Sequence, residues 1–276
     1  MTIEEAVQRT IEAFPFDEYM TVDDAAKGAY SNIARVALRY LKPGGSILDF
    51  GSGPCEKAAI LQFLGFSCSA CDDLQEQWHQ LPGNRERIAS FAQRCGVYFA
   101  QAAPGALPFA KSSFDMVMLH DVLEHLHGSP RDLLNDLLEL TKPGGLLFVT
   151  VPNAANIKKR IELLFGRTNM HDFASYYWYP GPWRGHNREY VHNDLVELSA
   201  YLDLDVLELR GCDHMLQKVP GVVRPAYLLA TRFLQGWKDS WLQVAKRRAR
   251  WSPRRRLPQD ELTRILRRTM YVEPEK

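Results

Sequence analysis

The stretch Ser-Ile-Leu-Asp-Phe-Gly-Ser-Gly-Pro-Cys at residues 46–55 decides the fold. Its first part, Ser46–Phe50, has the short apolar character of a buried strand, and the glycines that follow allow a tight turn into a helix. Glycines at such a turn also let a ligand approach the backbone closely. Asp49 places a carboxylate just before them. The stretch therefore predicts a strand, a ligand-binding turn and a helix in direct succession.

The same pattern recurs as a regular alternation of short apolar strands and helices of about ten residues. Such alternation is typical of an α/β fold, in which a largely parallel sheet has helices on both faces. Two helices with apolar positions at helical spacing precede it. We expect strands at 46–50, 66–71, 97–100, 115–120 and 145–151, and helices at 3–14, 25–41, 56–64, 85–94 and 131–140.

The alternation is interrupted by a long insertion at 153–190, with a helix expected at 157–165. A long irregular segment in a compact domain is usually functional or disordered, and the many aromatic residues here argue against disorder. Two interpretations stay open: a lid that packs its own small core, or an aromatic wall for an acceptor molecule. The aromatic residues are Phe173, Tyr176, Tyr177, Trp178, Tyr179 and Trp183. Beyond the insertion we expect helices at 193–201, 224–234 and 260–268, and strands at 205–210 and 240–246.

Composition places the chain among ordinary globular proteins. Its 276 residues are 46% hydrophobic and 24% charged, which argues against disorder, a collagen-like fibre or a membrane bundle. No uncharged apolar run of about 18 residues is present, so no spanning helix is expected. The N-terminus lacks the charged-then-apolar order of a secretory signal, and the five cysteines have no spacing that would form a zinc site. We therefore expect a reduced, cytoplasmic protein and assign no metal ligands, and the sequence leaves open whether a divalent metal is needed.

The ligand expected at the glycine turn is a nucleoside that carries a positive charge. A phosphate loop is disfavoured because the Lys-Ser/Thr pair that would hold phosphate and magnesium is missing. A dinucleotide is disfavoured because Asp49 would repel a pyrophosphate, whereas it would attract an ammonium group. Asp72 ends the second expected strand, where a carboxylate can accept hydrogen bonds from both hydroxyls of a ribose.

Several ordered motifs resemble those of class I S-adenosylmethionine-dependent methyltransferases, over about residues 28–247. The resemblance implies a Rossmann-like, doubly wound sheet of seven strands in the order 3-2-1-4-5-7-6, with the last strand antiparallel and helices on both faces. It also implies S-adenosyl-L-methionine as the cofactor. The motifs are ILDFGSGP at 47–54, LPF at 107–109, SFDMV at 113–117, VLEHL at 122–126, LTKPGG at 140–145, GHNREY at 185–190 and SWLQVAK at 240–246.

The resemblance further implies which residues contact the cofactor and how the chain is divided. The chain departs from the family pattern at Cys55, which replaces the third glycine of the loop, and near Gln101, where the family's acidic contact to adenine is absent. The expected parts are an N-terminal helical cap at 1–41, a methyltransferase domain at 42–247 and a basic extension at 248–276. The expected cofactor contacts are Asp49, Gly51, Gly53, Asp72, Gln101, Leu119 and His120.

Methyl transfer to a hydroxyl needs alignment, exclusion of water and removal of a proton. We expect His186 and then Asp121 to serve as the base. His125 is interpreted as a packing histidine, and His120 as a contact made through its backbone. The most probable reaction is O-methylation of a sugar, a glycan or a lipid-linked small molecule. The alternatives are N- or C-methylation of another metabolite, or a non-catalytic S-adenosylmethionine-binding partner subunit.

The charge distribution suggests a further partner. From residue 220 onward the chain has 14 basic and 5 acidic residues, against 20 and 28 before it. A solvated face, a membrane-surface helix at 219–237 and a nucleic-acid contact would each explain this basic end. Nucleic acid is disfavoured, because base-methylating relatives carry an Asn/Asp-Pro-Pro-Tyr/Phe-like segment where this chain has Leu-His-Asp-Val at 119–122. We therefore expect a peripheral membrane contact through the basic C-terminal part, if the end has a partner.

Overall fold

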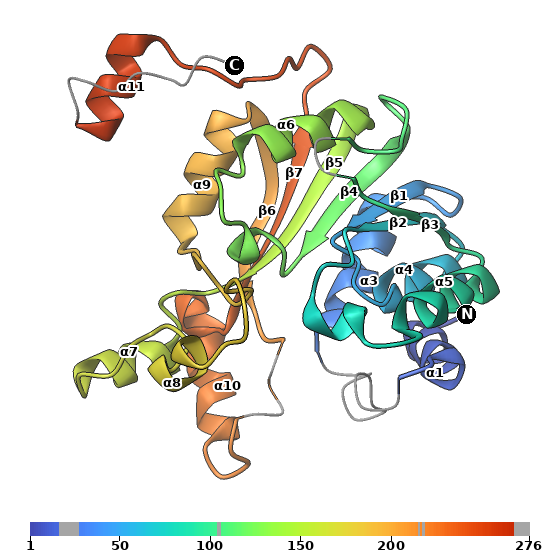
Figure 1. The fold of residues 1–276 in the computed structure, drawn as a ribbon. Helices are drawn as coiled ribbons and strands as arrows, with labels where there is room; N and C mark the ends of the chain where they lie inside the picture. The colour runs from blue at the N-terminus through green and yellow to red at the C-terminus, as the bar shows by residue number, and fades with distance from the viewer. Residues whose placement is uncertain (17–27, 104–105, 215, 217–218, 268–276) are drawn as a thin grey trace.

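The computed structural model describes residues 1–16, 28–103, 106–214, 216 and 219–267. Its centre is a seven-stranded sheet in the order β3-β2-β1-β4-β5-β7-β6 (Figure 1). All neighbouring strands are parallel except β7, which is antiparallel to both β5 and β6. The sheet confirms the expected fold class and strand order. The strands are β1 (Ser46–Phe50), β2 (Ser67–Asp72), β3 (Tyr98–Gln101), β4 (Phe114–His120), β5 (Thr141–Pro152), β6 (Leu204–Cys212) and β7 (Ser240–Arg247).

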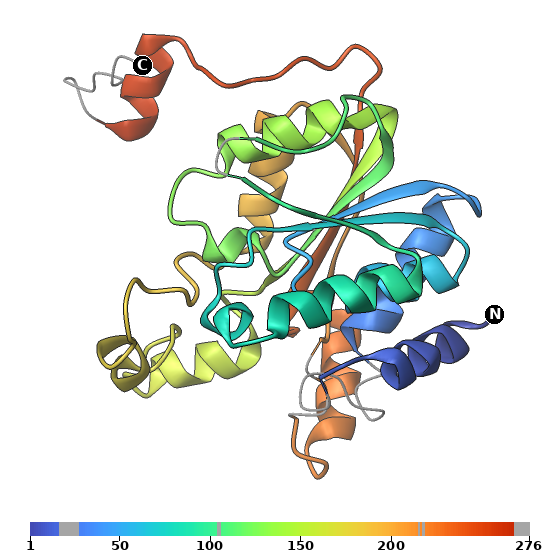
Figure 2. The ribbon, with the colours of Figure 1, turned by 45° about the vertical axis from the view of Figure 1, so that its right-hand side comes forward.

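Helices cover both faces of the sheet (Figures 1 and 2). One face carries α1 (Ile3–Ala13), α3 (Ala29–Tyr40), α4 (Glu56–Phe63) and α5 (Asn84–Cys95), and the other carries α6 (Arg131–Leu140) and α9 (His192–Tyr201). Alternation along β4 explains the two cores, because successive side chains of a strand point to opposite faces. Met116 and Met118 pack on the side of α4, whereas Val117 and Leu119 pack on the side of α6.

The two N-terminal helices, in the expected cap at 1–41, contribute to the core rather than standing apart from it. Val7 of α1 and Ile33 of α3 are buried against α4. Helix α1 begins with a capping box, in which the Thr2 hydroxyl accepts a hydrogen bond from the Glu5 N–H and the Glu5 carboxylate accepts one from the Thr2 N–H. The first residues of the helix expected at 25–41 lie outside the described part of the chain.

Short elements that the sequence pattern did not predict lie near the ends of the strands. Each is about one turn long, too short to show a helical repeat of apolar residues. They are η1 (Gln77–Gln80), η2 (Leu123–His125), α8 (Phe173–Tyr177) and η4 (Gln235–Trp237). Two of them, η1 and η2, follow β2 and β4 directly, so they lie at the carboxyl edge of the sheet, where ligands of open α/β sheets bind.

Three helices gather at this carboxyl edge: α7 (Ile157–Leu164), α8 and α10 (Arg224–Phe233). The last helix, α11 (Gln259–Leu266), follows β7 and lies at the opposite end of the molecule (Figures 1 and 2). Helix α11 begins one residue before the range 260–268 that we expected, and residue 268 lies outside the described part of the chain. Within the described residues, none of the helices has the length and hydropathy needed to cross a bilayer.

The basic segment after β7 is held against the domain. The Trp251 indole is buried and donates a 2.7 Å hydrogen bond to the Leu202 carbonyl. Ion pairs join the arginines of the segment to aspartates of the domain, so much of its positive charge is neutralised within the chain. The pairs are Arg248 with Asp203 and Asp205, Arg254 with Asp203, and Arg255 with Asp132 and Asp136.

Candidate active site

The turn after β1 is held by three residues in the left-handed region of backbone space. Gly51, Gly53 and Cys55 have φ of 70°, 54° and 70°. A Cβ atom on Gly51 would also lie 2.4 Å from Cγ2 of Val122, so the turn after β4 packs directly on this loop. Cys55, where the family has a third glycine, adopts the same left-handed conformation and leads into α4. Replacement of the family's third glycine by Cys55 therefore leaves the backbone geometry of the loop unchanged.

Asp49 is a buried acid without a partner. Its side chain lies at the end of β1 with 1% of the residue exposed, and neither carboxylate oxygen has a hydrogen-bond partner among the described residues. Burial raises the pKa of Asp49 to about 7, although the positive charge of Lys57 opposes the rise. Buried polar groups in folded proteins are normally hydrogen-bonded, so an unpartnered carboxylate at a strand tip indicates a ligand group.

Asp72 faces the same loop from the end of β2. One of its oxygens accepts a 2.8 Å hydrogen bond from the Gly53 N–H, and the other accepts a 2.7 Å bond from the Leu74 N–H. Burial raises the pKa of Asp72, and its charge in turn helps to raise the pKa of Asp49. The structure thus brings together the two acids that the sequence analysis paired. Each Asp72 oxygen keeps a second lone pair that a ligand hydroxyl can use.

His79 is a buried histidine close to Asp72 that the sequence analysis did not single out. It lies in η1 with its ring buried, and its Nδ1 atom has no hydrogen-bond partner among the described residues. Burial lowers the pKa of His79, although the Asp72 charge opposes the change. The sequence carries only one signal for it, a polar residue shortly after the acid that ends the second strand.

The other expected cofactor contacts take different positions. Gln101 ends β3 and is exposed, and its amide donates a 3.3 Å hydrogen bond to the Asp73 carbonyl. Leu119 is fully buried in the core beneath α6, so only its backbone faces the carboxyl edge. His120 is buried with its Nδ1 3.0 Å from the Thr150 hydroxyl, its Nε2 has no partner among the described residues, and burial holds its pKa well below the usual range.

The turn after β4 places an exposed acid beside a buried one. Asp121 has a φ of 56° and is exposed, and its N–H donates a 3.0 Å hydrogen bond to the Thr150 carbonyl. Glu124, in η2, has a fully buried side chain whose two oxygens lack hydrogen-bond partners in the described structure. Burial, with the nearby charge of Asp121, raises the pKa of Glu124 to about 9. The sequence analysis quoted Glu124 within a motif but gave it no role.

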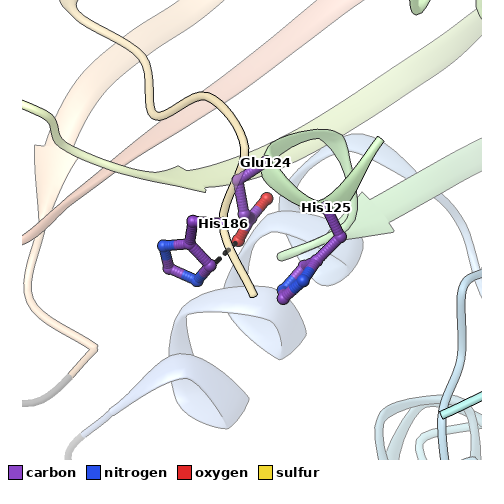
Figure 3. Close-up of side chains that lie close together, drawn as sticks. All are labelled: Glu124, His125 and His186. Atoms are coloured by element: carbon purple, nitrogen blue, oxygen red, sulfur yellow. Dashed lines mark ion pairs between the residues drawn. The ribbon is translucent and has the colours of Figure 1, made fainter. Parts of the chain in front are cut away.

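Two histidines flank Glu124 (Figure 3). His125 Nδ1 lies 2.7 Å from the Arg184 carbonyl, and His186 Nδ1 lies 2.8 Å from Glu189 Oε1. His186 Nε2 is 4.0 Å from Glu124 Oε1, which is too long for a hydrogen bond. Burial, reinforced by the neighbouring histidines, lowers the pKa of His186 to about 4. His186 is therefore a neutral imidazole at neutral pH.

The aromatic insertion supports both of its interpretations in part. Trp183 is the centre of a small cluster, with ring centroids 5.2 Å from Tyr176, 5.1 Å from Tyr179 and 5.4 Å from His171. Other aromatic rings of the insertion are exposed, among them Phe173 and Trp178. The insertion also reaches across the carboxyl edge, since the Gln77 amide donates a 2.7 Å hydrogen bond to the Pro180 carbonyl.

Comparison with known proteins identifies the family. Residues 21–209 match the family described as "Methyltransferase domain". The chain belongs to this family. Among curated relatives, an "Uncharacterized methyltransferase" of Mycobacterium sp. (strain KMS) is 28% identical over 144 residues, covering 50% of this chain and 53% of that protein. A "Demethylmenaquinone methyltransferase" of Corynebacterium glutamicum (strain R) is 34% identical over 109 residues, covering 40% and 42%. The chain thus spans about half of the length of the curated relatives it matches, or less.

Solved structures share the fold of this methyltransferase-family chain. The 1,6-didemethyltoxoflavin-N1-methyltransferase of Burkholderia thailandensis, solved with 1,6-didemethyltoxoflavin and S-adenosylhomocysteine, has a TM-score of 0.52, 20% identity and coverage of 88% of both chains. The [4+2]-cyclase SpnF has a TM-score of 0.54 and 15% identity, covering 89% of this chain and 93% of its own. The predicted family, its fold and S-adenosylmethionine as the cofactor are confirmed. The named relatives differ in what they act on, so the family does not fix the acceptor.

Proposed function

We propose that this methyltransferase-family chain transfers a methyl group from S-adenosylmethionine to a hydroxyl group of a sugar, a glycan or a lipid-linked small molecule. The observation that carries the proposal is Asp49, a buried carboxylate beside the glycine turn with no partner among the described residues. The ammonium group of the cofactor's methionine part is the type of partner that such a carboxylate needs. Gly51 and Gly53 adopt the left-handed backbone of the turn that follows it.

The remaining cofactor contacts follow from the neighbouring strands. Asp72 accepts hydrogen bonds from the two ribose hydroxyls through the lone pairs that its backbone partners leave unused. Gln101, the next strand end along the edge, is placed to contact the adenine. The backbone of Leu119 and His120 borders the cofactor at the tip of β4. When bound, the cofactor supplies the electrophilic methyl group, and the chain supplies alignment and exclusion of water.

The two expected catalytic residues take different roles in this proposal. His186 is neutral at neutral pH, its Nδ1 is engaged with Glu189, and its Nε2 can accept a hydrogen bond from an acceptor hydroxyl. Asp121 is exposed at the tip of β4 and follows the strand that borders the cofactor. We therefore assign orientation of the hydroxyl to His186 and removal of its proton to Asp121.

The surface at the carboxyl edge supports an acceptor with an apolar part. Large apolar side chains project from α7, α8 and α10 or just beyond them, and Leu164 and Trp178 are 84% and 78% exposed. Basic residues lie among them, which favours an anionic lipid surface. The apolar residues are Leu164, Phe165, Phe173, Trp178, Leu229 and Phe233, and the basic ones are Lys158, Arg160, Arg167 and Arg232. We call this set the apolar rim.

The apolar rim replaces the C-terminal segment as the membrane contact in our proposal. The segment after β7 pairs its arginines with aspartates of the domain and leads away from the carboxyl edge (Figure 1). The rim, in contrast, consists of residues of the aromatic insertion itself and of α10, which lies within the stretch 219–237 where a membrane-surface helix was expected. Methylation of a nitrogen or carbon of another metabolite is the second candidate, because the named relatives act on different molecules.

Transfer of a labelled methyl group tests the proposal. The purified chain is incubated with S-adenosylmethionine carrying a labelled methyl group and with a panel of hydroxyl, amine and carbon acceptors, including polyprenol-linked sugars. We expect label in a hydroxyl acceptor, and turnover about 10²–10⁴-fold lower in Asp121→Asn with cofactor affinity unchanged. Label in an amine or carbon acceptor alone would favour the second candidate. Cofactor binding without transfer to any acceptor would favour a non-catalytic partner subunit.

A further inference from the structure

Three potential metal ligands meet beyond the tip of β4. Glu124 and His125 are adjacent in the sequence, but His186 is far from both, so the sequence alone does not suggest a site. Glu124 and His125 come from η2, and His186 comes from the loop that ends the aromatic insertion. One ligand atom from each lies within 4.8 Å of the others. Figure 3 shows the Glu124 carboxylate between the two imidazole rings. The sequence analysis assigned no metal ligands and left open whether a divalent metal is needed, so this cluster was not expected.

The outer hydrogen bonds of the two histidines leave one particular nitrogen of each ring available. His125 Nδ1 faces the Arg184 carbonyl at 2.7 Å, and His186 Nδ1 faces the Glu189 carboxylate at 2.8 Å. Both partners are acceptors, so each Nδ1 carries the hydrogen and each Nε2 keeps its lone pair. A backbone carbonyl or carboxylate on the far nitrogen is the arrangement that orients histidine ligands in metal sites.

Glu124 supplies an independent indication of a ligand. Its side chain is fully buried, yet neither oxygen has a hydrogen-bond partner within the described part of the chain. The backbone around it is well satisfied, since the Glu124 carbonyl accepts hydrogen bonds from the N–H groups of Asn187 and Arg188. Those bonds fix the insertion loop against η2. The Glu124 carboxylate is thus left without a hydrogen-bond partner in the described residues, and a ring nitrogen of each histidine lies within 4.8 Å of it.

We propose that Glu124, His125 and His186 bind a divalent transition-metal ion, with zinc the best match. Two imidazoles and one carboxylate form a ligand set that suits zinc or iron(II) rather than magnesium or calcium, which prefer oxygen ligands alone. Three protein ligands leave at least one position for a further oxygen ligand, as in catalytic zinc sites. Asp121 adds a second negative charge close to Glu124, which also favours a cation.

The position of the cluster gives the ion a role in the proposed reaction, and this role rests on the proposed function. Val122 packs on Gly51, so η2 begins directly against the cofactor loop, and the insertion closes over its other side. The ion takes the lone pair of His186 Nε2, so it replaces the hydrogen bond proposed for that atom as the group that orients the acceptor hydroxyl. A hydroxyl bound to the ion becomes more acidic. Its proton passes to Asp121, its oxygen forms a bond to the methyl carbon, and the bond from that carbon to the sulfonium sulfur breaks with the electron pair left on sulfur.

Metal binding by the full chain, measured without turnover, tests the proposal. The chain is stripped with a chelator, titrated with Zn²⁺ alone by calorimetry, and then with Co²⁺ for its visible spectrum. We expect one tight equivalent of Zn²⁺, weakened more than ~100-fold in Glu124→Gln and His186→Ala and roughly 10–100-fold in Glu189→Gln, whose effect is only on ring orientation. His127→Ala, an exposed histidine in the same segment, is the matched control and should bind as the parent does.

The cobalt spectrum separates this cluster from another pair of potential ligands. Cys212 Sγ lies 3.3 Å from His214 Nε2, and a metal there would show a thiolate-to-cobalt charge-transfer band. Binding without that band, lost in Glu124→Gln while S-adenosylhomocysteine still binds, supports the proposal. Absence of Zn²⁺ binding, a thiolate band, or equal affinity in Glu124→Gln and the parent would overturn it. The Zn²⁺ and Co²⁺ titrations need no methyl transfer, so failure of the metal proposal can be told apart from failure of the proposed function.

Discussion

The Gly53 N–H donates a 2.8 Å hydrogen bond to the carboxylate of Asp72, which ties the end of β2 to the glycine turn after β1. The bond joins two segments that are separate in the sequence but adjacent in the sheet. It also fixes the direction of the Asp72 side chain, because the second oxygen is held by the Leu74 N–H. A carboxylate held in this way is already oriented before a ligand arrives, which reduces the entropic cost of binding.

Replacing Asp72 should therefore weaken cofactor binding. Asp72→Ala removes the acceptor for two ribose hydroxyls, and we expect a loss of ~1–3 kcal/mol in binding free energy. The measurement is a calorimetric titration with S-adenosylhomocysteine. Asp73→Ala, which changes the exposed acid next to it, is the control and should bind normally. Unchanged affinity in Asp72→Ala would remove this residue from the cofactor site.

The unusual pKa of Asp49 predicts how the stability of the free protein depends on pH. The folded-state pKa of about 7 lies above the unfolded value, so the folded state binds the proton more tightly. The stabilisation that comes from proton binding by Asp49 is fully present at about pH 4, and it is lost as the pH rises towards and through 7. At pH 8 the Asp49→Asn variant should be more stable than the parent by up to about 4 kcal/mol, whereas at pH 4 the two should be similar.

Urea unfolding without cofactor at pH 4.5 and pH 8 checks this prediction. Asp205→Asn is the control, because its carboxylate is exposed and ion-paired with Arg248 at the opposite end of the sheet. A stability difference between Asp49→Asn and the parent that is the same at both pH values would show that Asp49 does not titrate in this range.

At Cys55 the left-handed backbone should make a glycine variant more stable than an alanine variant, which is the reverse of their usual order of stability in a helix. A non-glycine residue held in this region costs about 1–3 kcal/mol, so Cys55→Gly should be more stable than Cys55→Ala by about 1 kcal/mol. Cys95, the buried last residue of α5, provides the opposite case, because a helical position favours alanine over glycine by up to about 1 kcal/mol. Thermal unfolding of the four variants gives the comparison, and the same order at both positions would contradict the backbone assignment at Cys55.

The apolar rim predicts which substitutions affect a membrane contact. Exchange of Phe165 and Trp178 for serine should reduce sedimentation with anionic phospholipid vesicles at least about tenfold, because two large exposed apolar side chains are lost. Exchange of Arg264 and Arg267 of the C-terminal segment for glutamine is the control and should have little effect. Loss of vesicle binding in the arginine variant alone would return the contact to the basic C-terminal part.

Much of the fold could be predicted because its signals are local. The apolar spacing at 131–140 predicts α6 with its correct ends, and the short apolar run with its glycine turn predicts β1 and the loop after it. The acids Asp49 and Asp72 could be paired for the same reason, since each ends a recognisable strand. The sheet order came from the family resemblance rather than from any local pattern.

The parts that could not be predicted depend on contacts between distant segments. Glu124 lies in a single 3-10 turn within an apolar run, and nothing local distinguishes it from a helix surface residue. Its convergence with His186 is created by the path of the insertion loop, which the composition of that loop does not specify. The basic C-terminal run was likewise open to several interpretations until its ion pairs with aspartates of the domain were seen.

Calorimetric titration of the parent and of Asp49→Asn with S-adenosylhomocysteine at pH 7.5 tests the central claim most directly. The claim is that the buried carboxylate at the tip of β1 pairs with the ammonium group of the cofactor. We predict that the parent binds one equivalent, that Asp49→Asn binds at least about tenfold more weakly, and that Asp260→Asn, on the exposed surface of α11, binds as the parent does. Equal affinity in Asp49→Asn and the parent, or no binding by the parent, would contradict the account.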